Sequence, residues 1–392
     1  MEKKVLAFDF GASGGRAMCG TFDGDKISIE ELHRFSNDPV ILNGSMYWDV
    51  LRLFFEIKQG LIKAKKCGKI ESIGIDTWGV DFGLIDEEGR LLENPVHYRD
   101  ARTEGMIEES FKLIDKEKFY QITGNQFMDL NTAFQLLSLV KTRKELLEKA
   151  DKMILMPDLF NYFLTGEKKA EYSIASTTQL LDAKKGEWSD EVIEALGIPK
   201  HIFPEIVPTG TKIGTLTDEI CTELGLDKID VMAVAGHDTQ SALVSVPTSE
   251  EDFIFLSCGT WSLLGTELAE PIINEKSEHY NITNEGGYGR KISFLKNIIG
   301  LWCIQESRRQ WMSQKEREKL HNSVKEMSTD LASLRLWQKK LRHFRALLIR
   351  MHRNSHLPEI FRQESVNSAR RQDSLFRKQS EKLFVASTRV LQ

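Results

Sequence analysis

The chain has 392 residues, a formal net charge of −5, and an ordinary globular composition with 41% hydrophobic and 28% charged residues. This length predicts about two or three domains with sizeable cores. No apolar run approaches the ~18 residues of a membrane-spanning helix, and the N-terminus lacks the features of a signal peptide. The five cysteines are scattered without a CxxC pair, so neither a zinc site nor a disulfide framework is expected, and a reducing cytoplasm fits best.

The first predicted element is a strand over residues 5–8, which ends in Asp9 and a glycine-rich turn before apolar residues resume at Ala17. Glycines let the backbone approach a ligand closely, and successive free N–H groups can bind phosphate oxygens. Asp9 could then face a Mg²⁺ ion carried by the phosphates. A plain β-hairpin explains the same pattern. A Walker loop is excluded because no Gly-Lys-Ser/Thr follows, and a dinucleotide fingerprint because the turn leads into a strand.

Strands and helices then alternate along the chain. Alternating apolar and polar residues predict a strand over 26–35, and apolar residues at helical spacing predict a helix over 48–66. A mixture of hairpins and strand–helix units is typical of an α/β fold. The same criteria predict further strands over 71–78, 80–85, 153–157 and 230–235, and helices over 130–149, 158–164, 173–181 and 240–244.

A second strand–turn–strand unit follows the first 245 residues. The apolar run 253–257 meets Cys258-Gly259-Thr260 and returns as Trp261–Leu264. This order echoes residues 5–18, and pattern alone leaves chance and internal duplication open. A duplication would give two related domains, each with a phosphate-facing hairpin, and ligands bound in the cleft between them.

Three polar stretches could carry chemistry. In residues 236–239 (GHDT), a carboxylate stands between a strand and a helix, where it could accept a proton from a hydroxyl group or simply cap the helix. Residues 76–82 combine two carboxylates, an indole and a glycine, which suits a sugar but equally a strand-end bend around a core tryptophan. Arg99 and Arg102 could bind hydroxyls or phosphates, or form surface ion pairs. Residues 284–287 indicate only a loop.

Taken together, these stretches resemble the rhamnulokinases, which are bacterial carbohydrate kinases of the FGGY group. The resemblance covers about residues 3–311, and DTWGVDF and NITNEGG distinguish it from xylulose and glycerol kinases. It implies an α/β fold, actin-like and ribonuclease-H-like, with two domains around a cleft, the N-terminal one over 1–245 and the start of the second over 246–311. The motifs, in chain order, are DFGASGGR, GIDTWGVDF, YRDART, LMPDLFNYFLTG, AGHDTQSA, SCGTWSL, NITNEGG and LKNIIGLWCIQE.

The resemblance implies transfer of the γ-phosphoryl group of ATP to the 1-hydroxyl of L-rhamnulose, with Mg²⁺. Other deoxy-ketose kinases, such as fuculokinase, stay open as alternatives, and no nucleic-acid or membrane partner is expected. Asp9 would face the metal and Asp238 would be the general base. ATP would be contacted by Ala12, Ser13, Gly14 (where relatives often have serine), Gly15, Arg16, Thr260 and Gln305. The sugar would be contacted by Gly79, His237, Asp238, Thr239 and Asn297.

Residues 312–392 depart from the resemblance. Residues 301–392 hold 20 Lys+Arg against 9 Asp+Glu and no glycine. A basic nucleic-acid arm has such a composition, but with permitted codons residues 337–344 and 372–392 can be read in a shifted frame as segments expected of a rhamnulokinase. We therefore expect a frameshift between about residues 312 and 337, a poorly ordered tail and a second domain lacking its adenosine side. A chain of this kind would have little kinase activity or be a catalytically dead sugar-binding remnant.

Overall fold

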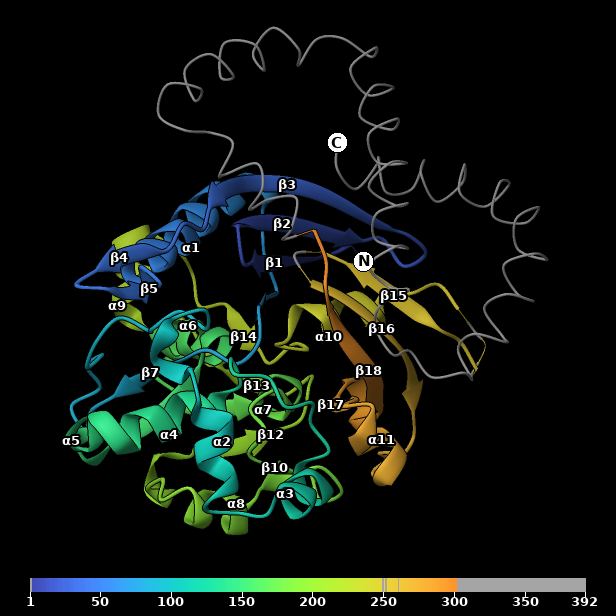
Figure 1. Cartoon of the computed structure of the whole chain (residues 1–392). Helices are drawn as coiled ribbons and strands as arrows, with labels where there is room; N and C mark the ends of the chain where they lie inside the picture. Colours follow the sequence, from blue (N-terminus) through green and yellow to red (C-terminus); the bar gives the residue numbers. More distant parts are fainter. Residues whose placement is uncertain (1, 249, 251, 260, 302–392) are drawn as a thin grey trace, which may run out of the picture. The chain divides into compact units, whose positions relative to one another are not determined.

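The computed structural model describes residues 2–248, 250, 252–259 and 261–301 (Figure 1). All of these residues belong to one compact unit, Met1–Gln305. The expectations for the tail, for Thr260 and for Gln305 fall outside the described residues.

A six-stranded mixed sheet forms the centre of the first domain. Its opening hairpin confirms the predicted strand, glycine turn and returning strand, with Asp9 opposite Arg16 and Gly11 opposite Gly14. The third strand extends the hairpin, and two later strands add in parallel on the other side. The order is β13 (Lys212–Thr215), β14 (Asp230–Met232), β6 (Ser72–Thr77), β1 (Lys3–Gly11), β2 (Gly14–Phe22) and β3 (Ile27–Ser36).

Helix α1 (Val50–Ala64) covers one face of this sheet, as its apolar spacing predicts. The Asp49 side chain caps the helix by accepting from the Arg52 N–H. Gly60 lets the helix lie against the sheet, because a Cβ at this position would be 2.5 Å from the Phe8 ring. The alternation of β1 buries Leu6, Phe8 and Phe10. Asp9 alternates with these buried residues, so its side chain at the carboxyl end of the strand lies outside the core.

Short strands and helices cover the rest of the first domain (Figure 1) and enclose a second hydrophobic core. None of the helices in the described ranges is long and apolar enough to cross a membrane. The helices are α2 (Met106–Phe111), α3 (Lys116–Thr123), α4 (Thr132–Thr142), α5 (Lys144–Lys149), α6 (Met156–Thr165), α7 (Tyr172–Ser176), α8 (Asp190–Ala195), α9 (Asp218–Leu224) and α10 (Asp238–Val244). The strands are β4 (Val40–Leu42), β5 (Ser45–Tyr47), β7 (Phe82–Ile85), β8 (Lys152–Leu155), β9 (Lys169–Glu171), β10 (Leu181–Asp182), β11 (Glu187–Trp188) and β12 (Glu205–Val207).

Several predicted element boundaries were wrong, and three of these differences have a local physical cause. The helix expected over 130–149 is two helices, because Arg143 has φ −148° and ψ 49° and its guanidinium pairs with Glu93. The helix expected over 173–181 stops at Ser176, where threonine hydroxyls donate back to helix carbonyls and compete with further turns. The strand expected over 153–157 ends at Leu155, since a helix begins at Met156 and Pro157 stands in its first turn, a position that suits proline.

The described residues after α10 form an antiparallel four-stranded sheet, which confirms the second strand–turn–strand unit. Its order is β15 (Phe255–Cys258), β16 (Trp261–Leu268), β18 (Ile292–Ile299) and β17 (Thr283–Gly286). Helix α11 (Glu275–His279) connects β16 to β17 and starts with a capping box at Asn274. Whether the two hairpins arose by duplication stays a prediction.

We expect Gly265→Ala to destabilise the second sheet. A Cβ on Gly265 would lie 2.5 Å from the Phe294 carbonyl oxygen and 2.8 Å from the Leu295 Cα, so β16 and β18 would have to separate. The loss should be about 1–3 kcal/mol of unfolding free energy, measured by urea denaturation. Gly259→Ala is the control on the same hairpin, because its added Cβ would meet only the Trp261 oxygen at 3.7 Å. Equal effects of the two substitutions would contradict the packing argument.

Candidate active site

Three carboxylates meet where the strands of the first sheet end. Asp9 on β1 lies opposite Asp76 on the parallel strand β6. The next residue, Thr77, donates its N–H to the Gly236 carbonyl at 2.9 Å and bridges to His237. This bridge brings the start of α10, and with it Asp238, to the same edge of the sheet. Ligands of open α/β sheets bind at such carboxyl ends.

These carboxylates repel one another. Burial raises the pKa of Asp76 well above its ordinary value, and the charges of Asp9 and Asp238 raise it further. Burial also raises the pKa of Asp238, although His237 opposes this shift. Arg16 pairs with Asp9 at 2.7 Å. Added positive charge at this edge would therefore be favourable.

The donor set fits Mg²⁺, which prefers carboxylate oxygens and retains several phosphate or water ligands. Within the described residues, no group of three His, Cys, Asp or Glu side chains is arranged to hold a metal. An ion here would thus be bound by one or two carboxylates, Asp9 among them, and completed by phosphate oxygens and water.

The turn between β1 and β2 consists of Ala12 and Ser13. Asn37 holds it from behind, since its backbone N–H donates to the Ser13 carbonyl at 3.2 Å and its side-chain amide to the Gly11 carbonyl at 3.0 Å. Packing also explains the neighbouring glycines. A Cβ on Gly14 would lie 2.9 Å from the Phe35 carbonyl oxygen, and a Cβ on Gly15 would lie 2.4 Å from the Phe35 ring. The glycines thus serve the close approach of β3 whether or not phosphate binds.

A strained turn follows β6 at Gly79. Val80 has φ +68°, which is rare for a β-branched residue, and the Asp81 N–H donates to the Gly79 carbonyl at 2.9 Å across it. Thr177 accepts from the Val80 N–H at 3.1 Å, and Thr132 donates to the Val80 carbonyl at 2.6 Å. Strain of this kind persists where the surroundings over-determine the backbone, often at functional sites.

Asp81 anchors the aromatic cluster behind this turn. Its Oδ2 accepts from the indole N–H of Trp48 at 2.6 Å and of Trp78 at 2.9 Å, and its Oδ1 accepts from Gln135 at 3.0 Å. Burial raises the pKa of Asp81 to about 6, although the three donors oppose this. Of the two open interpretations of residues 76–82, the bend around a core tryptophan describes Trp78, which is 5% exposed.

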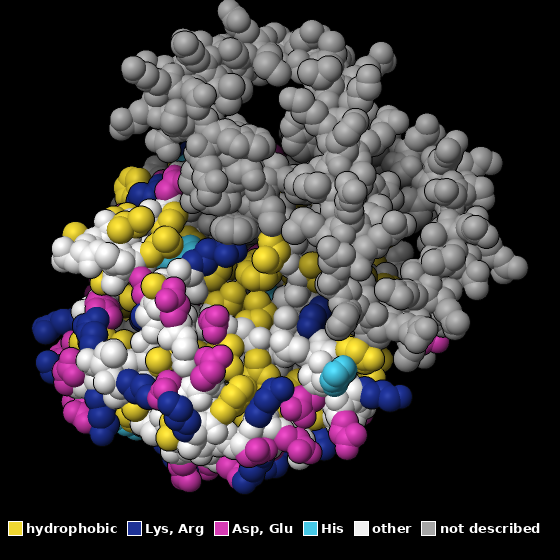
Figure 2. All heavy atoms as spheres, viewed as in Figure 1, with side chains coloured by type: hydrophobic (Ala, Val, Ile, Leu, Met, Phe, Trp, Pro, Cys, Tyr) yellow, Lys and Arg dark blue, Asp and Glu magenta, His cyan; other side chains and the backbone are white. Residues whose placement is uncertain are grey.

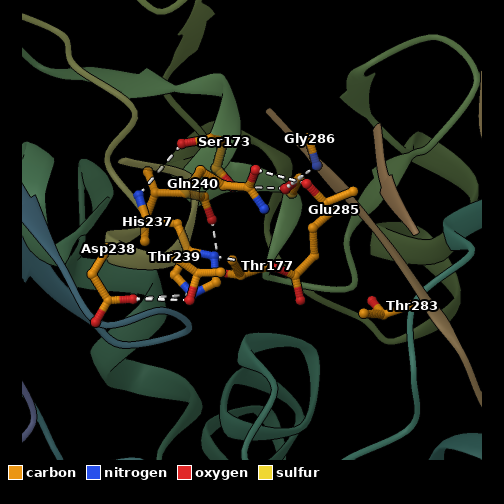
Figure 3. Close-up of polar contacts among 12 residues, drawn as sticks. Ser173, Thr177, His237, Asp238, Thr239, Gln240, Thr283, Glu285 and Gly286 are labelled. Carbon is orange, nitrogen blue, oxygen red and sulfur yellow. Dashed lines mark hydrogen bonds and ion pairs between the residues drawn. The ribbon is translucent and has the colours of Figure 1, made fainter. Parts of the chain in front are cut away.

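Residues of α7 and of the preceding strand β9 hold the start of α10 in place (Figure 3). The Glu171 carboxylate accepts from the Gly236 N–H at 2.9 Å, and the Ser173 hydroxyl accepts from the His237 N–H at 3.4 Å. Asp238 follows with a side chain 35% exposed, and Thr239 donates to it at 3.4 Å. His237, Asp238 and Thr239 are thus together, with one carboxylate facing outward.

Glu285 of β17 completes this group, and sequence reasoning missed it. Its Oε2 lies 3.1 Å from His237 Nδ1, while His237 Nε2 lies 3.6 Å from Asp238 Oδ1. The stretch that holds Glu285 was interpreted only as a loop, because its burial depends on contacts with a distant helix. The motif that contains Asp76 assigns this carboxylate no role.

The other predicted residues are more scattered. Gly79 lies at the strained turn, where a Cβ would approach Thr177 to 3.3 Å. Asn297 lies on β18, where its backbone N–H donates to Gln126 at 3.1 Å. Arg99 stacks on Trp261 of β16, with its guanidinium carbon 5.3 Å from the ring centre.

Charged side chains of both signs are interspersed over the face built from α2, α3, α5 and α8 (Figure 2).

Comparison with known proteins identifies the family. The N-terminal domain model of the FGGY family of carbohydrate kinases matches residues 4–245, which is more than half of the chain. The chain belongs to the FGGY family of carbohydrate kinases. The C-terminal domain model of the family matches residues 254–361 of this FGGY chain. That match extends beyond residue 311, where the motif resemblance ends, and the frameshift stays a prediction.

Curated relatives of this FGGY chain include rhamnulokinases. The one from Oceanobacillus iheyensis is 45% identical over 317 residues, which are 81% of this chain and 67% of the relative. The one from Bacteroides thetaiotaomicron is 43% identical over 312 residues, 79% and 64% of the two chains. The chain therefore spans about two thirds of the length of these relatives.

Solved structures confirm the expected fold class. Gluconate kinase from Lactobacillus acidophilus matches with a TM-score of 0.70 at 17% identity, covering 80% of this chain and 63% of that structure. Xylulose kinase from the same organism matches with a TM-score of 0.67 at 18% identity, covering 75% and 60%. At such identities the likeness concerns the fold alone, a two-domain α/β sugar-kinase fold.

Proposed function

We propose that this site serves the ATP-dependent phosphorylation of L-rhamnulose at its 1-hydroxyl, with Asp238 as the general base. The observation that carries the proposal is the position of Asp238, a half-exposed carboxylate beside Asp9 and Asp76 at the strand ends. The burial and negative neighbours that raise its pKa make it a better proton acceptor than an ordinary aspartate. Kinase members of the FGGY family and the rhamnulokinase relatives supply the reaction class and the sugar.

The remaining roles follow the motifs. Ala12 to Arg16 would receive the ATP phosphates on the turn that Asn37 supports, and Asp9 would face Mg²⁺, which neutralises phosphate charge when bound. Gly79, His237, Thr239 and Asn297 would contact the sugar. Thr260 and Gln305 would contact ATP. This chemistry suggests a soluble enzyme of the cytoplasm.

The test compares two deoxy-ketoses. The purified 392-residue chain is mixed with ATP and Mg²⁺, and ADP release is followed with L-rhamnulose or L-fuculose. We expect L-rhamnulose to be preferred, because rhamnulokinases are the relatives found at 45% and 43% identity. Equal rates would overturn the assignment of the sugar, and turnover of neither sugar would favour the second candidate.

That second candidate is a sugar-binding remnant without turnover. It is favoured by the basic, glycine-free composition of residues 301–392 and by the expected frameshift, since permitted codons allow parts of this stretch to be read in a shifted frame as rhamnulokinase segments. L-Rhamnulose binding measured by calorimetry, without ADP release, would support it. A rate comparable to that of a longer relative would exclude it. Resequencing the gene across the codons for residues 310–340 tests the frameshift itself.

A further inference from the structure

Glu285 is a carboxylate of the site whose role the motifs leave open. It comes from β17, in the range matched by the C-terminal family model, whereas Asp238 lies in the N-terminal range. Its side chain is only 6% exposed. A buried carboxylate is costly unless a cation or several donors face it. Among the described residues, the group that faces Glu285 is the His237 imidazole, whose Nδ1 lies 3.1 Å from Glu285 Oε2.

The backbone around Glu285 is fixed on both sides. The Asn284 N–H and side-chain amide both donate to the Gly124 carbonyl at 2.9 Å. The Gly286 N–H donates to the Ser176 hydroxyl at 2.7 Å, and a Cβ on Gly286 would strike the Tyr172 ring at 2.4 Å. Strand β17 is thus held against α7 and the end of α3. These contacts leave the Glu285 carboxylate little freedom to turn away from His237.

His237 lies between two carboxylates. Its Nδ1 faces Glu285 and its Nε2 faces Asp238 at 3.6 Å, and Glu171 is the third acidic group that acts on it. The Glu171 carboxylate is already occupied by the N–H groups of Ile174 and Gly236 and the Ser173 hydroxyl. Burial alone would lower the pKa of His237, but the carboxylates outweigh burial and raise it, Glu285 most strongly.

We propose that Glu285 is a positioning residue that holds His237 as an imidazolium between the two carboxylates and so orients Asp238. The imidazolium would fix Asp238 Oδ1, which leaves the other oxygen to accept the proton of the sugar hydroxyl. As the sugar oxygen forms its bond to the γ-phosphorus of ATP, the bond from that phosphorus to the β,γ-bridging oxygen breaks and ADP leaves. The hydroxyl proton passes to Asp238, and His237 keeps its own proton throughout. The orientation of the base in one family domain thereby depends on a strand of the other. This inference rests on the proposed function only for the role of Asp238.

The deciding experiment is a histidine NMR titration of the full-length chain without substrate. Uniform ¹³C-histidine labelling, with His237→Gln to assign the signal, gives the midpoint of His237. We expect that midpoint to lie above the ordinary histidine value and to fall by about one pH unit or more in Glu285→Gln. Glu267→Gln removes a carboxylate on the same sheet that pairs with Lys291, and should leave the midpoint unchanged. An unchanged midpoint in folded Glu285→Gln would overturn the proposal.

A second variant, Glu285→Asp, tests the proposal if Glu285→Gln folds poorly. Glu285→Asp keeps the negative charge but moves it away from His237 by the length of one methylene group. The His237 midpoint in this variant should therefore lie below that of the unsubstituted chain but above that of Glu285→Gln. An Asp variant that matches the unsubstituted chain would also overturn the proposal.

A binding profile then tests the orientation of Asp238. L-Rhamnulose affinity should weaken as pH rises through the His237 midpoint, and in Glu285→Gln this weakening should occur at lower pH. An affinity profile that does not move with the His237 midpoint would count against the orienting role. Absence of sugar binding at every pH would instead contradict the proposed function, while the His237 titration would still report on Glu285.

Discussion

Replacing Asp81 with alanine should cost about 3–5 kcal/mol of unfolding free energy. The substitution removes the acceptor of two indole N–H groups, those of Trp48 and Trp78, in a place with no exposure to water. It also removes the carboxylate that most strongly raises the pKa of the buried Arg102 guanidinium, a pKa that burial lowers. Urea denaturation would measure the loss.

Two comparisons separate this mechanism from a general effect of substitution. Glu87→Ala, on the exposed turn after β7, should change stability by less than about 0.5 kcal/mol. Asp81→Asn should have an intermediate effect, because either amide orientation sets an N–H₂ group against a donor, the indoles or Gln135. If Asp81→Ala unfolded at the same urea concentration as the unsubstituted chain, the carboxylate would not be the anchor of the cluster.

The raised pKa of Asp81 makes its contribution to the free energy of unfolding depend on pH. The pKa of about 6 in the folded chain exceeds the ordinary value of 3.8, so the folded state binds this proton more tightly. The resulting contribution to stability is present below about pH 4 and is lost as pH rises through about 6. Asp81→Asn should lack this dependence between those values.

The fold was predictable where a local pattern decides the structure. The alternation in β1 and the glycine turn after it specify the opening hairpin, and the apolar spacing of residues 50–64 specifies α1. The break between α4 and α5 was not predictable, because no proline or glycine marks Arg143 and its conformation accompanies an ion pair with Glu93, 50 residues away. The same holds for Val80, whose positive φ is maintained by Thr132 and Thr177.

The parts of the site that were predictable from the sequence are those formed by contiguous motifs. Asp9 and His237 to Thr239 lie at strand ends, where a sequence pattern can place them. Glu285 was out of reach, since nothing near it in sequence indicates that β17 docks on α7 or that His237 lies 3.1 Å away. The spacing between a motif and its partner on another domain is set by tertiary packing, which a single sequence does not display.

Asp238→Asn should lower the rate of L-rhamnulose phosphorylation by about 10³-fold, because an amide has no capacity to accept the hydroxyl proton. The side chain keeps its shape and its contact with Thr239, so the dissociation constant for the sugar should change by less than about tenfold. Single-turnover measurements with enzyme in excess over ATP provide the sensitivity that a slow chain requires. The matched control is Asp230→Asn on β14, a half-exposed carboxylate that pairs with Lys212 and should leave both quantities unchanged. A variant that retained the rate of the unsubstituted chain would remove Asp238 from the role of base, and Asp76, opposite Asp9 on β6, would then be the next carboxylate to test.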